Sequence, residues 1–429
     1  MTGLPRVLLV TDSDSYVKWG AALAHQIPKD WGLRLVVAKG NAEPSPRQLA
    51  EAIEGTRFEG RILERVGLDD MQNVLDTWRP DVVVAACRGW AVDALVRLIP
   101  NVPGRPVLVS GLAGIAVPVL SYGLGFRRAV DVFITHSRRE LREFTEASAR
   151  LGIPHRYELA TVPFISTAPR VEDHDSMTDT GRPPKRDRII FAAQAMVPES
   201  RRDRMWLVRR LIEIAKASPD LKIVIKVRAR DGEPQTHVEH FSYESLLDDL
   251  VAAGEVLPVN LVVESGAMSR HLSRAVGFVT VSSTAILESI AEDVPCLALS
   301  DFGVGGAQIN VVLEGSGLLG TSDDLVDGAF RHPDPEWLED NYFHDPAENT
   351  WLVALESLLE QRDRQGLTPY VELPPTVINR AKSMLYRHLA FAPDRHDARA
   401  IAERSFLAVA LWINRKRWAV LHAVRGLRF

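Results

Sequence analysis

The chain has 429 residues, of which 46% are hydrophobic and 25% are charged, and its formal net charge is −5. This composition is typical of a globular protein, and the length predicts two domains. The acidic balance argues against general nucleic-acid binding, which needs a broad cationic face. No apolar run reaches the roughly 18 residues of a membrane-spanning helix, and the N-terminus lacks a signal-peptide pattern, so we expect a cytoplasmic protein.

The first half of the chain alternates short apolar runs with amphipathic segments. The predicted strands are residues 6–11, 33–37, 81–86, 107–109, 132–135 and 157–162. The predicted helices between them include residues 71–78, 91–98 and 138–150. Such alternation is typical of βαβ units in a parallel, doubly wound sheet. We therefore predict a Rossmann-like N-terminal domain over residues 1–165.

Residues 166–188 lack apolar periodicity and are rich in Pro, Asp, Ser, Thr and Arg, a composition typical of linkers. A second alternating series follows and predicts a second Rossmann-like domain over residues 189–370. The fold class is therefore α/β, with two doubly wound domains facing a cleft. Open α/β sheets bind their ligands at the carboxyl ends of the strands, so we expect the functional site in that cleft.

The remaining residues, 371–429, are predicted to form a C-terminal helical segment. Residues 398–429 alternate apolar and basic side chains, and no acidic side chain follows Glu403. We favour a closing helix that packs across the domains. The alternative is a basic helix that lies on an anionic membrane, which would place the protein at the inner face of the cell membrane.

Two cysteines, Cys87 and Cys296, both follow apolar strand patterns. We expect them to be buried thiols in a reducing compartment, because neither has the spacing of a disulfide pair or a metal site.

Residues 277–310 contain two successive strand-to-helix turns, one rich in hydroxyl groups and one in glycine. Unpaired N–H groups at a helix start favour negative charge, so we expect both turns to hold the phosphate of a nucleotide. The residues assigned to this anion site are Ser282, Ser283, Thr284, Gly305, Gly306 and Gln308. Glu288 lies on the same helical face as Thr284, where its carboxylate can bind a ribose. The alternative is that Ser283 only caps a helix and that Glu288 is solvated.

Other candidates for the same ligand come from neighbouring strand ends of the second domain. Lys226 and Arg228 end a predicted strand, where two cations are costly without an anion; the alternative is an ion pair with an acid such as Glu264. His237 follows on a polar loop and is a candidate phosphate donor or leaving-group acid, although such a histidine is more often structural. Gln194 and Glu264 each follow a strand, and the backbone at Glu264 is a candidate contact for a nucleobase.

In the first domain, Asp14 and His136 each follow a predicted strand and are equal candidates for a general base. Helix capping is the competing explanation for Asp14. Two glycine-spaced loops, residues 111–115 and 121–125, are expected near the cleft. The sequence has no Walker loop, HExxH or GxSxG motif, and Asp12-Ser13-Asp14 matches a metal-binding DxD only weakly. Catalysis without a metal is therefore the simpler expectation.

Two Rossmann-like halves, a strand that ends in Ser-Ser-Thr, a glutamate five residues after the second serine and a Gly-Gly-x-Gln loop resemble bacterial glycosyltransferases of the GT-B fold. The sequence is most similar to enzymes of capsule and cell-surface polysaccharides. The segments 136–140 and 191–237 also resemble an uncharacterised actinobacterial group of glycosyltransferases.

The resemblance implies transfer of a sugar from a CMP- or UDP-linked donor to a glycan or lipid-linked acceptor, with no cofactor besides the donor. It places the donor phosphate at Ser282–Thr284 and the ribose at Glu288. The leaving phosphate would then contact Lys226, Arg228 or His237. Position 296 is a cysteine, so the Glu-x7-Glu pattern of retaining enzymes is absent, which favours inversion.

Two other classes of function remain open from the sequence. One is a nucleotide-sugar epimerase or a polyol-phosphate transferase of the same fold. An epimerase needs several carboxylates in the donor pocket, and the sequence indicates only Glu264 and Glu288. The other class is a non-catalytic binding protein.

Overall fold

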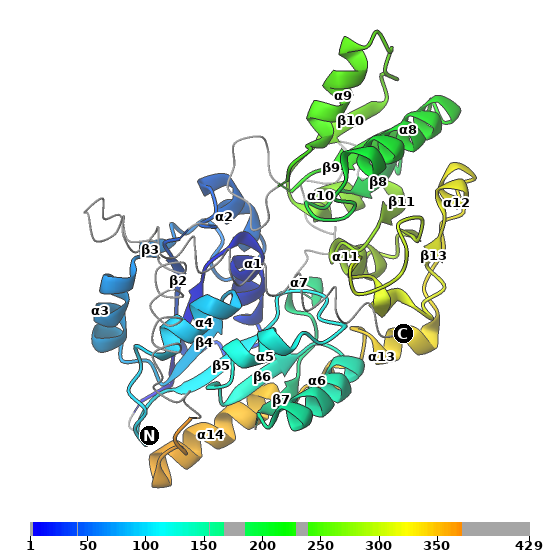
Figure 1. Ribbon diagram of the computed structural model, residues 1–429. Coiled ribbons are helices and arrows are strands. Elements are labelled where there is room, and N and C mark those ends of the chain that lie inside the picture. Colours follow the sequence, from blue (N-terminus) through cyan, green and yellow to red (C-terminus); the bar gives the residue numbers. More distant parts are fainter. Residues whose placement is uncertain (1–2, 41, 154, 167–184, 229–238, 371–429) are drawn as a thin grey trace, which may run out of the picture.

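The structure of the protein is a computed structural model that describes residues 3–40, 42–153, 155–166, 185–228 and 239–370 (Figure 1). His237, most of the predicted linker and the predicted C-terminal helical segment lie outside these residues.

The first sheet has seven parallel strands in the order β3-β2-β1-β4-β5-β6-β7. Its strands are β1 (Arg6–Thr11), β2 (Gly32–Ala38), β3 (Glu64–Val66), β4 (Val82–Ala86), β5 (Val107–Gly111), β6 (Val132–Thr135) and β7 (Arg156–Leu159). The helices between and after them are α1 (Asp14–Leu23), α2 (Pro46–Ile53), α3 (Leu68–Trp78), α4 (Gly89–Val96), α5 (Ser121–Phe126), α6 (Arg138–Leu151) and α7 (Pro163–Ser166). The strand order reverses between β1 and β4.

The second sheet has six strands in the order β10-β9-β8-β11-β12-β13. Its strands are β8 (Arg188–Ala192), β9 (Lys222–Lys226), β10 (Leu261–Glu264), β11 (Ala275–Thr280), β12 (Cys296–Leu299) and β13 (Leu319–Gly320). The later helices are α8 (Arg201–Ala217), α9 (Tyr243–Ala252), α10 (Met268–Leu272), α11 (Ala285–Ala291), α12 (Ser322–Val326), α13 (Pro335–Asp340) and α14 (Trp351–Gln365). Here the order reverses between β8 and β11. The two doubly wound sheets confirm the predicted fold class.

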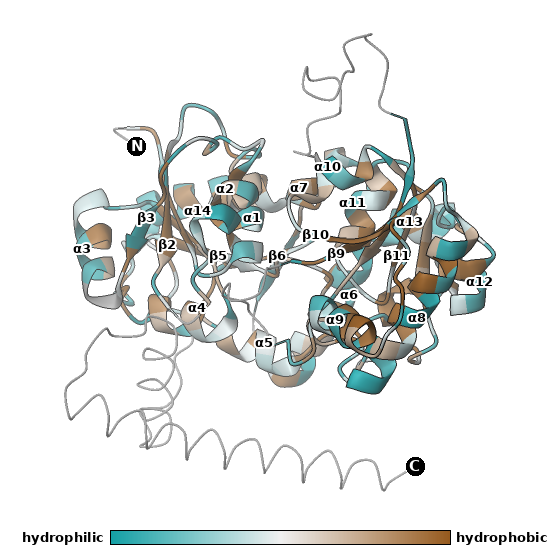
Figure 2. Cartoon of the chain, turned by 90° about the horizontal axis from the view of Figure 1, so that it is seen from above, coloured by the Kyte–Doolittle hydropathy of each residue, from teal (hydrophilic) through white to brown (hydrophobic). Residues whose placement is uncertain are grey.

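Continuous runs of buried apolar residues explain why the central strands form. Alternation along β1 directs Val7 and Leu9 into one hydrophobic cluster, and Leu8 and Val10 into the cluster on the opposite face. Helices cover both faces of a parallel sheet, so its strands need no polar side. Figure 2 shows the same layering, with mainly hydrophobic strands in the interior of each half.

Helix α14 packs against the first sheet, although the predicted second domain, residues 189–370, includes it (Figure 1). Trp351 and Leu355 of α14 are buried in the same cluster as Val7, and Trp351 Nε1 donates a hydrogen bond to Gln26 Oε1 at 2.7 Å. The chain therefore returns to the first sheet after completing the second. We call the first sheet with α1–α7 and α14 the first lobe, and the second sheet with α8–α13 the second lobe.

Two local differences separate the observed elements from the predicted ones. The predicted glycine-spaced loop 121–125 is part of helix α5. Strand β7 ends at Leu159 rather than at residue 162. Cys87 and Cys296 are free and buried, as predicted.

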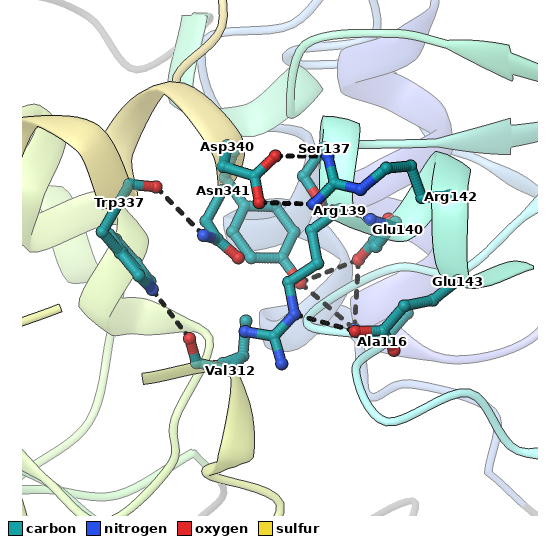
Figure 3. A network of polar contacts seen from close by, with 11 residues as sticks. Ala116, Ser137, Arg139, Glu140, Arg142, Glu143, Val312, Trp337, Asp340 and Asn341 are labelled. Atoms are coloured by element: carbon teal, nitrogen blue, oxygen red, sulfur yellow. Dashed lines mark hydrogen bonds and ion pairs between the residues drawn. The ribbon is translucent and has the colours of Figure 1, made fainter. Parts of the chain in front are cut away.

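A polar network between α6 and the segment around α13 joins the two lobes (Figure 3). Glu140 of α6 accepts hydrogen bonds from the backbone N–H of His136 at 2.8 Å and from the hydroxyl of Tyr342, which follows α13, at 2.8 Å. Arg142 of α6 forms two hydrogen bonds with Asp340 of α13, at 2.6 and 2.7 Å. Burial raises the pKa of Glu140 to about 7, although its hydrogen-bond donors oppose this shift.

This pKa makes the stability of the lobe junction depend on pH. The folded state holds a proton on Glu140 up to about pH 7, whereas the unfolded state releases it near its ordinary pKa of 4.5. The stabilisation of the wild-type protein relative to Glu140→Gln should therefore fall by roughly 3 kcal/mol as the pH rises from 4.5 to 7. Urea unfolding of both proteins across this range tests it, with Glu143→Gln on the same helix as control. If the difference in the free energy of unfolding between the wild-type protein and Glu140→Gln does not change with pH, this account of Glu140 is contradicted.

Candidate functional site

A cavity of about 440 Å³ lies between the two lobes and is lined by both. The second lobe contributes residues 192–197 after β8, 226–228 at the end of β9 and 282–285 after β11. The first lobe contributes side chains of α1 and α2 and residues after β5. The cavity therefore lies at the carboxyl ends of the strands, next to the point where the second sheet reverses its order.

The predicted hydroxyl-rich turn forms part of the cavity wall, and Gln194 orients it. Gln194 Oε1 accepts a hydrogen bond from Ser282 N at 2.8 Å, and Gln194 Nε2 donates to Ser282 Oγ at 2.9 Å. Thr280 Oγ1 accepts from Ser283 N at 3.1 Å, and Ser283 Oγ accepts from Ala285 N at 3.3 Å. The N–H groups of Ser282 and Ser283 are thus already paired, so the turn offers mainly hydroxyl groups to a ligand.

Lys226 brings a positive charge into the same cavity. Among the residues that the structure describes, no hydrogen bond or ion pair reaches its ammonium group. Burial lowers the pKa of Lys226 to about 8, while the charges of Glu288 and Glu51 oppose the shift. An ammonium group in this environment favours an anionic ligand.

Two other predicted residues, Glu288 and Arg228, line the cavity and pair with side chains of α1. Lys18 Nζ lies 2.7 Å from Glu288 Oε1. Arg228 Nε donates to Asp14 Oδ2 at 2.5 Å, and Arg228 Nη2 contacts both Asp14 and Ser15. Asp14 caps no helix; its carboxylate is bound to the opposite lobe.

His136 does not lie in the cavity, so the prediction that it is an accessible base needs correction. Its side chain is buried, its Nε2 accepts a hydrogen bond from Trp19 Nε1 at 2.7 Å, and its Nδ1 lies 2.9 Å from Ala160 O. Burial lowers the pKa of His136 to about 4. Both ring nitrogens are engaged in the core of the first lobe, which leaves none for a substrate.

The predicted glycine-rich turn and Glu264 also lie outside the cavity lining. Gly305 N donates to Asn310 Oδ1 at 2.9 Å, and of this loop only Ile309 lines the cavity, while Gly306 and Gln308 do not. The expected convergence of two anion-binding turns is therefore not observed in the lining. Glu264 pairs with Lys222 and lies 3.4 Å from His271 Nδ1, so its carboxylate is already satisfied.

The sequence prediction missed several side chains of the first-lobe wall. They are Lys18 on α1, together with Gln48, Glu51 and Glu54 on or just after α2. Lys18 lies one helical turn after Asp14, so the i, i+4 spacing was the available signal. Helix α2 begins with the capping box of Ser45 and Gln48, another signal that the sequence contained.

The lobes touch at Gly114, in the loop after β5. A Cβ atom at Gly114 would lie 2.8 Å from Thr284 Oγ1 of the hydroxyl-rich turn. The absence of a side chain at position 114 therefore lets the first lobe approach the turn closely.

Within the described part of the chain, no group of three His, Cys, Asp or Glu side chains has the arrangement of a metal site. None of the described helices is long and apolar enough to cross a membrane.

The sequence matches, over residues 7–358, a family model described as "Putative glycosyltransferase (DUF6716)". No curated protein matches the sequence.

Several solved structures share the fold. A UDP-N-acetylglucosamine 2-epimerase from Listeria monocytogenes, itself described as putative, has a TM-score of 0.53 at 12% identity, over 87% of this chain and 100% of that chain. The enzyme from Neisseria meningitidis bound to UDP-GlcNAc has a TM-score of 0.52 at 12% identity, over 83% and 99% of the two chains. The enzyme from Methanocaldococcus jannaschii in complex with UDP-GlcNAc and UDP has a TM-score of 0.53 at 12% identity, over 82% and 99%. These likenesses show a two-lobed, GT-B-like fold.

The contact between Gly114 and Thr284 can be tested by a double-mutant cycle. Gly114→Ala should lower the free energy of unfolding by about 1–3 kcal/mol, because the added methyl group overpacks the lobe contact. Thr284→Ala removes the opposing atoms, so the double variant should be more stable than the sum of the single effects predicts. Gly123→Ala, where a Cβ meets no atom within 4 Å, is the matched control in urea unfolding. Strictly additive effects would show that the two residues do not touch.

Proposed function

Because the chain belongs to the family described as "Putative glycosyltransferase (DUF6716)", we propose that it transfers a sugar from a nucleotide-sugar donor to a hydroxyl group of a glycan or lipid-linked acceptor. The observation that carries the proposal is the Lys226 ammonium beside the Ser282–Thr284 turn, in a cavity between two lobes, where no side chain of the described residues pairs with it. A cation next to hydroxyl groups is suited to phosphate oxygens.

The donor is proposed to bind with its phosphates at Lys226 and the hydroxyls of Ser283 and Thr284. Glu288, on the helix that follows the turn, is proposed to accept hydrogen bonds from the ribose. Three proteins of similar fold have UDP or UDP-GlcNAc in their names, so a uracil nucleotide is the first donor to test, with CMP as the alternative.

The acceptor is proposed to enter against the first-lobe wall, where Asp14 is the candidate base. The acceptor oxygen bonds to the anomeric carbon as the bond from that carbon to the phosphate oxygen breaks. The electron pair stays on the leaving phosphate, and the acceptor proton passes to Asp14. Lys226 and Arg228 stabilise the charge that develops on the phosphate, which is the kind of contribution that usually dominates such transfers. A single displacement of this type inverts the anomeric centre.

A cell-surface glycan as acceptor, and the absence of any cofactor other than the donor, belong to the same proposal.

A nucleotide-sugar epimerase is the second candidate function. The observation in its favour is the set of carboxylates that line the cavity, which is larger than the sequence indicated: Asp14, Glu51, Glu54, Glu239 and Glu288. Epimerisation needs acid and base groups around the sugar. Incubation with UDP-GlcNAc without acceptor separates the candidates by NMR: an epimerase yields a second nucleotide sugar, whereas a transferase releases UDP only slowly by hydrolysis.

The nucleotide site itself is tested by removing the hydroxyl groups of the turn. Ser283→Ala/Thr284→Ala should weaken nucleotide binding by about tenfold or more, since hydrogen bonds to a charged group contribute about 1.5–3 kcal/mol. Isothermal titration calorimetry with UDP and CMP measures this effect. Thr77→Ala/Thr145→Ala is the matched control, because these exposed hydroxyls bond only to their own helices. Unchanged affinity in the Ser283/Thr284 variant would remove this site from the proposal.

Lys226 predicts a dependence of nucleotide binding on pH. The ammonium form is proposed to hold the phosphate, and burial lowers the pKa of Lys226 to about 8. Affinity should therefore fall as the pH rises from 7.5 to 9.5, whereas Lys226→Arg, which keeps its charge, should lose this dependence. The same nucleotide is titrated into both proteins, so that its own ionisation cancels. Equal pH profiles would show that Lys226 does not contact the phosphate.

A further inference from the structure

Among the ion pairs between the lobes, Asp14–Arg228, Lys18–Glu288 and Glu54–Arg270 each involve a residue that lines the cavity. The first two involve the side chains to which the proposed function assigns the donor. Asp14 and Lys18 lie one turn apart on α1, so a single helix of the first lobe pairs with both Arg228 and Glu288 of the second lobe.

The Asp14–Arg228 pair is accessible to solvent. Arg228 is 42% exposed and Asp14 is 21% exposed, so water and a ligand can reach the pair. The pair between Asp12 and Arg88 in the first lobe is different, because Asp12 is only 1% exposed and accepts from both the backbone and the side chain of Arg88. An exposed pair contributes little net free energy, and a competing phosphate can displace it.

We propose that the Asp14–Arg228 and Lys18–Glu288 pairs form a charge-exchange switch that frees the catalytic base only when the donor is bound. This inference rests on the proposed function. In the structure Asp14 is bound to Arg228. A donor phosphate takes Arg228, and the ribose hydroxyls take Glu288. Asp14 is then free to accept the proton of the acceptor hydroxyl as its oxygen bonds to the anomeric carbon and the phosphate leaves with the electron pair.

The switch and a purely structural role of the ion pairs predict opposite changes in donor affinity when the pairs are removed. If the pairs only held the lobes together, their loss would open the cleft and weaken donor binding. If they compete with the donor, their loss strengthens its binding, because Arg228 and Glu288 no longer have to leave another partner.

The test compares binding and turnover in Asp14→Asn, Lys18→Met and Arg270→Gln. Arg270→Gln breaks an ion pair between the lobes at a side chain outside the cavity lining, and is the matched control. The switch predicts that Asp14→Asn lowers the Kd for UDP by about two- to fivefold, the range that an exposed ion pair allows. Lys18→Met should lower the Kd for uridine, which offers a ribose but no phosphate, by a similar factor. Arg270→Gln should change neither value.

Measuring kcat as well as the donor Kd distinguishes the role of Asp14 as a base from its role in the switch. Asp14→Asn should lower kcat for transfer by about a hundredfold or more, the usual contribution of a general base, while its donor Kd improves. An unchanged or larger Kd in Asp14→Asn would overturn the switch but leave the proposed nucleotide site intact, provided that the wild-type protein binds UDP or CMP. Absence of nucleotide binding to the wild-type protein would instead overturn the proposed function, and the switch with it.

Discussion

The ammonium group of Lys226, which no described residue reaches with a hydrogen bond or an ion pair, determines which ligands the cleft favours. Lys226 ends β9, a strand with three consecutive buried apolar residues, and lies at the carboxyl edge of the sheet, where it lines the cavity. Burying an ammonium group partly away from water costs free energy unless an anion lies beside it. The neighbouring turn of Ser282–Thr284 supplies hydroxyl groups, and both lobes surround the space between them. These features together favour a phosphate-bearing ligand over a neutral one.

The cavity exists because the two lobes approach closely. Gly114 leaves room for Thr284, and α1 reaches across to Arg228 and Glu288. Glu140 and Arg142 bind Tyr342 and Asp340, so α6 of the first lobe is joined to the segment around α13. Helix α14 then returns the chain to the first lobe. The site is therefore a property of the lobe arrangement as much as of either sheet.

The sequence predicted the features that local patterns encode. The apolar runs of β1 and β4 identified a parallel sheet, and the Ser-Ser-Thr turn identified part of the cavity wall. It did not predict that His136 is buried and hydrogen-bonded, because its partner Trp19 lies 117 residues away in the chain. The sequence patterns also did not predict the partners of Asp14 and Glu288, because each ion pair joins two lobes that are built from separate segments of the chain. The glycine-rich turn was placed in the site because its composition suited an anion, but its backbone is bound to Asn310 instead.

A crystal structure of the protein with UDP or CMP tests the central claim most directly. The account predicts phosphate oxygens within hydrogen-bonding distance of Lys226 Nζ and of the Ser283 or Thr284 hydroxyl, in the cavity between the lobes. A nucleotide bound at any other place, for example at the point between β1 and β4 where the first sheet reverses its order, would contradict it.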